Sequence, residues 1–187
     1  FANAESRSMR RSQPGRSRSA AVVTGTGFML QSGTHVLRTA TGATTADASG
    51  KALVLVSSTV TAADVNTKFR TVVNPVLTWE SALLDDLGMA GTSGTEFGTL
   101  SGQTQVDIVA PAHPLAAGLS GRVTVTASAQ TFTWGRPNGN AALVARPAGD
   151  TTRAVIFGYA KGAAMPGLAA PGRRVGVAIR GTSPVAP

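Results

Sequence analysis

The chain has 187 residues, a formal net charge of +8 and no cysteine. This length allows one domain with a sizeable core, and an apolar content of 42% excludes a chain that is disordered throughout. The absence of cysteine excludes disulfides, thiolate nucleophiles and cysteine-bound metals. No stretch approaches the ~20 apolar residues that cross a bilayer, so the sequence predicts no membrane span.

The basic charge is concentrated near the N-terminus. Residues 1–19 contain five arginines against the single acid Glu5, and they are rich in serine. We interpret them as a flexible basic arm, followed by a single domain over residues 20–181 and a tail over 182–187. Such an arm can bind nucleic acid. It lacks interleaved aromatic residues, however, which favours a solvated leader over a nucleic-acid-binding segment.

Residues 51–88 have the pattern of strand, helix, strand, helix. The strands are expected over residues 52–57 and 75–79, and the helices from residue 61 and over 81–87. Thr61 and Asp64 have the spacing of a capping box, and Val65 and Phe69 fall on one helical face. Two strands joined by a helix imply a parallel pair with a right-handed crossover.

The rest of the chain predicts short strands. They are expected over residues 20–24, 35–39, 106–109, 123–127, 130–134, 141–146, 153–159 and 174–179. Gly149 and Asp150 indicate a hairpin, residues 123–127 and 130–134 are expected to pair, and residues 89–105 are expected to form a loop. Alternating strands and helices followed by hairpins predict an α/β three-layer sandwich. Gly25-Thr26-Gly27 after the first strand lacks the third glycine of a dinucleotide loop.

Several segments occur in the order found in a known family. They are KALVLVSSTV, KFRTVVNPVLTWE, LLDDLGM, HPLAAGLSG and VIFGYAKGAAMPG. On these segments the chain resembles the class I glutamine amidotransferase-like superfamily, in particular its trehalose-utilisation-type branch and a module of large secreted bacterial proteins. The resemblance covers roughly residues 44–180. It implies a flavodoxin-like fold with a mostly parallel sheet and C-terminal hairpins, in an extracellular or cell-surface protein.

The catalytic residues of that family do not carry over. The resemblance places Glu80 where the family has its nucleophilic cysteine, and Ser81 and Ala82 replace the glycines of the oxyanion hole. The His-x-Glu pair is absent, since the histidines are His35 and His113 and neither has an acidic residue two positions on. The sequence therefore favours a chain that is not an enzyme.

Two alternatives depend on a few side chains. Glu80 and His113 are candidates for the acid and base of a hydrolase or sugar-modifying enzyme, if both line one pocket. The competing interpretation is a helix-terminal charge for Glu80 and a turn residue for His113. Trp79, Trp134 and Tyr159 are candidates for a sugar-stacking surface, against ordinary packing.

The interpretation that these observations favour is a non-catalytic structural or interaction module of a secreted or surface bacterial protein. Its expected partners are other copies of the chain or other domains of a larger protein, and carbohydrate in the alternative with exposed aromatics. No cofactor and no metal site are expected, because the carboxylates are scattered around a single candidate histidine.

Overall fold

The computed structural model describes residues 20–23 and 35–178, with side chains from residue 37 onward. The basic arm over residues 1–19, the Gly25-Thr26-Gly27 motif and the tail over 182–187 lie outside the described residues.

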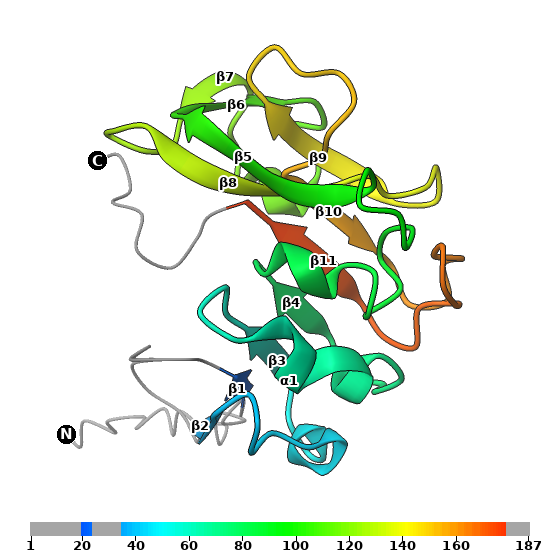
Figure 1. The fold of residues 1–187 in the computed structure, drawn as a ribbon. Helices are drawn as coiled ribbons and strands as arrows, with labels where there is room; N and C mark the ends of the chain where they lie inside the picture. The colour runs from blue at the N-terminus through cyan, green and yellow to red at the C-terminus, as the bar shows by residue number, and fades with distance from the viewer. Residues whose placement is uncertain (1–19, 24–34, 179–187) are drawn as a thin grey trace, which may run out of the picture.

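One large mixed sheet runs through the molecule. It has nine strands (Figure 1). In spatial order they are β2 (His35–Arg38), β1 (Ala20–Val23), β3 (Leu53–Val56), β4 (Val76–Thr78), β11 (Arg174–Val177), β10 (Ile156–Tyr159), β9 (Ala142–Pro147), β6 (Gln105–Ile108) and β7 (Gly121–Thr124). Neighbours from β2 to β11 are parallel, and neighbours from β11 to β7 are antiparallel.

A second, two-stranded sheet lies in front of the antiparallel half in Figure 1. It consists of β5 (Phe97–Gln103) and β8 (Gln130–Gly135), which pair antiparallel. The expected loop over residues 89–105 therefore contains a strand. The expected pairing of residues 123–127 with 130–134 is wrong, because β7 pairs with β6 and β8 pairs with β5.

The helices are short. They are α1 (Ala62–Val65) and the 3₁₀ turns η1 (Thr45–Ala48), η2 (Asn66–Phe69), η3 (Ser81–Leu83) and η4 (Pro114–Ala116). Of the residues that the structure describes, 34% are in strands and 13% in helices, so the expected flavodoxin-like three-layer sandwich with a mostly parallel sheet is wrong. One physical reason is visible at Asn66, whose φ of 46° ends α1 after one turn. Thr61 occupies the predicted N-cap, but its side chain makes no capping hydrogen bond.

Several local predictions are confirmed within this different architecture. β3 and β4 pair in parallel, and Val65 and Phe69 are both buried. The predicted hairpin around Gly149 is formed by β9 and β10. The apolar positions of residues 81–87 are buried as expected, although they belong to a 3₁₀ turn and the loop after it instead of a full helix.

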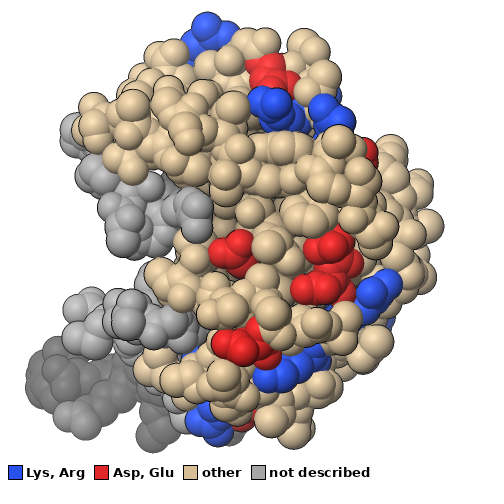
Figure 2. Space-filling view, viewed as in Figure 1, with Lys and Arg blue, Asp and Glu red and all other residues tan. Residues whose placement is uncertain are grey.

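The core consists of two hydrophobic clusters. The first packs the short helices against the parallel strands and includes Val54, Phe69, Leu84 and Phe157. The second lies between β8 and the antiparallel half, and its largest members are Phe132 and Trp134. Over the face with the short helices, acidic side chains gather across the middle of the molecule (Figure 2).

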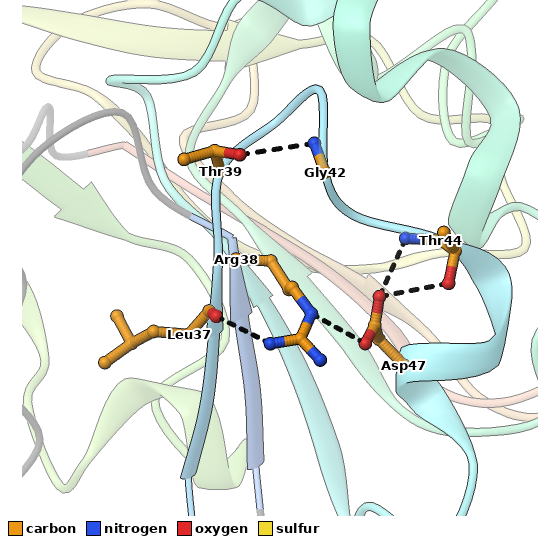
Figure 3. A network of polar contacts seen from close by, with 6 residues as sticks. All are labelled: Leu37, Arg38, Thr39, Gly42, Thr44 and Asp47. Atoms are coloured by element: carbon orange, nitrogen blue, oxygen red, sulfur yellow. Dashed lines mark hydrogen bonds and ion pairs between the residues drawn. The ribbon is translucent and has the colours of Figure 1, made fainter.

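A polar network joins β2 to η1 (Figure 3). Arg38 donates from Nε to Asp47 at 2.8 Å and from Nη1 to the carbonyl of Leu37 at 3.1 Å. The backbone N–H and the hydroxyl of Thr44 both donate to the same Asp47 carboxylate, at 2.8 and 3.0 Å. These donors, the Thr44 N–H first, hold the pKa of Asp47 below its usual value. The network fixes a connection that contains only a 3₁₀ turn.

Arg174 ties the parallel strands to the segment after η2. Its side chain is fully buried at the start of β11. The guanidinium donates to the carbonyls of Val72 at 2.7 Å, Asn74 at 3.0 Å and Arg70 at 3.1 Å, with longer contacts to Phe69 and Arg173. Burial lowers the pKa of Arg174 to about 10, which leaves it charged at neutral pH.

Candidate functional site

Glu80 lies two residues after the end of β4, at the carboxyl end of the parallel strands. Its side chain is 8% exposed, and its Oε1 accepts a hydrogen bond from the Ala82 N–H at 3.1 Å. Its own N–H donates to the Thr78 hydroxyl at 3.0 Å. Glu80 is therefore the N-cap of η3, where a carboxylate satisfies a backbone donor that the turn leaves free.

His113 has the equivalent position before η4. Its Nδ1 accepts from the Leu115 N–H at 3.1 Å, so the neutral ring carries its proton on Nε2. The half-buried ring lines a cavity of about 210 Å³. Asn140, Tyr159 and Arg173 also line this cavity. An imidazole with one nitrogen engaged in capping can still offer the other to a ligand.

The structure does not place Glu80 and His113 in one cavity. The His113 cavity extends to Arg173 and Val175, at the start of β11, and Glu80 is not among its lining residues. β4 and β11 are parallel with Val175 opposite Leu77. Glu80 therefore lies three residues, or ~10 Å along the strand direction, beyond the level of Val175.

The three candidate aromatic residues do not share an exposed surface. Tyr159 is 1% exposed; its hydroxyl donates to the Met89 carbonyl at 3.2 Å and accepts from the Asn138 N–H at 3.0 Å. Burial raises the pKa of this phenol to about 12. Trp134 is 9% exposed and packs in the second cluster, whereas Trp79 is half-buried. A sugar-stacking platform built from all three is not present.

A second cavity, of about 270 Å³, is lined by residues that the sequence analysis did not select. Three of its lining residues are arginines, Arg136, Arg146 and Arg153, and we call it the arginine pocket. The sequence contains a signal for part of this pocket. Arg146 ends the first expected strand of the hairpin and Arg153 begins the second, so a hairpin brings these two arginines close together. Arg136, directly after β8, comes from a separate part of the chain.

Among the described side chains, no three His, Cys, Asp or Glu residues are grouped as metal ligands would be. No helix in residues 20–23 and 35–178 has the length and apolar character needed to cross a membrane. The chain matches no protein-family model, and its comparison with curated proteins and with solved structures gives no significant match. The geometry of the sites therefore carries the functional argument.

Proposed function

We propose that the chain is a non-catalytic interaction module. The observation that carries this proposal is the use of both candidate catalytic side chains as backbone caps. Glu80 accepts from the Ala82 N–H and His113 accepts from the Leu115 N–H. A general acid and base must reach the same reacting group through hydrogen bonds, and these two side chains serve different turns.

The test is a double variant, Glu80→Gln with His113→Asn, in which each new side chain keeps an oxygen that can accept the capping hydrogen bond. The wild-type chain and the variant are assayed on a panel of nitrophenyl esters and glycosides. We expect no turnover above buffer for either protein and closely similar thermal unfolding. Turnover by the wild type that the folded variant lacks would establish the hydrolase alternative instead.

Self-association is the second part of this proposal, and its test is the solution mass by light scattering across a range of protein concentrations. A mass that rises with concentration, or a stable multimer, supports association of copies of the chain. A monomer at every concentration would contradict this part and leave other domains or proteins as the partners. The extracellular bacterial setting implied by the sequence resemblance stays a prediction.

A further inference from the structure

The arginine pocket brings together arginines from three strand ends. Arg136 follows β8, Arg146 lies within β9, and Arg153 precedes β10. These are three of the eight arginines whose side chains the structure describes. Asn138, Thr151 and Thr152 line the same cavity and add polar groups to it. The cavity is therefore a concave, basic surface between β8, β9 and β10.

Two of these arginines are held directly opposite each other. Gly135 and Ala154 form an antiparallel bridge with reciprocal backbone hydrogen bonds of 2.9 and 2.8 Å. The adjoining residues, Arg136 and Arg153, are consequently cross-strand neighbours. Both guanidinium groups also lie against the Trp134 ring, at 5.7 and 5.0 Å from its centroid. Like charges at opposing positions destabilise a sheet unless an anion lies between them.

The charges around the pocket do not balance. Arg153 pairs with Asp150 at 3.3 Å, but that carboxylate also accepts from the N–H and hydroxyl of Thr152. Arg146 donates to the neutral carbonyl of Thr151. Three guanidinium groups thus face one carboxylate, an excess of two positive charges.

Donor capacity is left over as well. The Nε–H groups of Arg136 and Arg153 are buried and have no acceptor among the described residues. A buried donor without an acceptor is costly, and a bound ion is one way to satisfy it. The Nε–H of Arg174 is also buried without an acceptor, but Arg136 and Arg153 differ from it because they line a cavity. Guanidinium groups pair best with oxyanions, which accept two parallel hydrogen bonds from one arginine.

We propose that the arginine pocket binds a doubly charged tetrahedral oxyanion carried on a small ligand, a phosphate monoester. Two negative charges match the excess of two positive charges. The volume of about 270 Å³ corresponds to roughly nine water molecules at ~30 Å³ each, which leaves room for an organic group beside the anion. This site goes beyond the proposed interaction module and depends neither on Glu80 nor on His113.

The binding assay uses inorganic phosphate and inorganic sulfate as probes, at constant ionic strength. The chain has two tryptophans, so Trp79→Phe leaves Trp134, which lies against Arg136 and Arg153, as the single tryptophan, and excitation at 295 nm avoids the one tyrosine. We expect a saturable change in its emission with either dianion and much weaker binding of acetate. In the unsubstituted chain, NMR of the arginine Nε–H groups should show shifts at Arg136 and Arg153. A response to sulfate with none to phosphate would contradict a phosphate monoester as the ligand.

The variants locate the site. Arg136→Gln and Arg153→Gln should each weaken dianion binding about tenfold or more, because each removes a charged donor pair. Arg173→Gln removes the same group from the His113 cavity and should bind like the parent. Arg136→Lys keeps the positive charge but loses the planar guanidinium that can donate two parallel hydrogen bonds to one oxyanion. It should therefore bind the dianion less tightly, while its Tm stays at that of the parent. Absence of saturable binding, equal binding of acetate, or full affinity in Arg136→Gln and Arg136→Lys would overturn the proposal.

Discussion

Replacement of Arg174 by methionine should be strongly destabilising. The substitution keeps most of the buried stem and removes the guanidinium group. Three of its hydrogen bonds to carbonyl groups are 3.1 Å or shorter, and each charge-assisted bond contributes roughly 1.5–3 kcal/mol. Part of this loss is offset, because the methionine variant no longer has to remove a charged group from water, which costs several kcal/mol. The net loss is therefore about 3 kcal/mol, which lowers Tm by roughly 6–12 °C in a chain of this size.

The assay is urea and thermal unfolding followed by circular dichroism. Arg173→Met is the matched control, since Arg173 is the exposed neighbour and its replacement should change stability by no more than about 0.5 kcal/mol. Arg174→Lys should lie between wild type and Arg174→Met, because an ammonium group supplies donors but cannot span the same carbonyls. An Arg174→Met chain within about 1 kcal/mol of wild type would refute the assigned role.

Three further predictions concern packing and titration. Gly172→Ala should cost about 1–3 kcal/mol in urea unfolding, because its Cβ would lie 2.3 Å from the Val73 carbonyl oxygen, whereas Gly94→Ala, with open space around it, should be neutral or slightly stabilising. The side-chain donors of Arg122 and the Gly149 N–H lower the pKa of Asp107 to about 2. The contribution of Asp107 to the free energy of unfolding is therefore complete above pH 3.8 and is lost as the pH falls toward 2. Asp107→Asn should remove that part of the pH dependence of unfolding, and an unchanged dependence of stability on pH would contradict this. Tyr159 is the single tyrosine, and its absorbance should titrate near pH 12 in the folded chain. Its contribution to the free energy of unfolding is complete below pH 10 and should disappear as the pH rises from 10 to 12. A titration midpoint near pH 10 in the folded chain would disprove the burial of this phenol.

The parts of the fold that could be predicted are those in which local pattern and burial agree. The apolar run that became β3 is a continuous buried strand, and Val65 and Phe69 are core residues whether their backbone is α-helical or 3₁₀. The hairpin around Gly149 has a local turn signal, so β9 and β10 were predictable as a pair.

The failures arise where tertiary contacts replace local preference. β5 contains Gly98 and Gly102 and reads as a loop, yet the Trp134 ring from β8 lies 3.2 Å from the position a Cβ on Gly98 would take. The glycine that weakens the strand signal is the residue that lets the ring approach. Nearness in sequence favours a pair between residues 123–127 and 130–134, but β7 pairs with β6 and β8 pairs with β5. A single sequence does not encode such pairings locally.

The candidate site divides in the same way. The sequence offered a helix-terminal charge for Glu80 and a turn residue for His113 as alternatives to catalysis, and the structure places the two residues as the N-caps of η3 and η4. The arginine pocket required knowledge that Gly135 pairs with Ala154, which brings Arg136 beside Arg153. This bridge joins segments about 20 residues apart without a turn signal specific to it, so the cluster becomes visible only in three dimensions.

The capping role of Glu80 is the central claim about function, and a comparison of Glu80→Gln with Glu80→Ala tests it most directly. The glutamine oxygen can accept from the Ala82 N–H as Oε1 does, so Glu80→Gln should unfold within about 0.5 kcal/mol of wild type. Glu80→Ala removes the acceptor and should lose about 1 kcal/mol or more. Equal stability of wild type and both variants would contradict the capping role and return Glu80 to the candidates for chemistry.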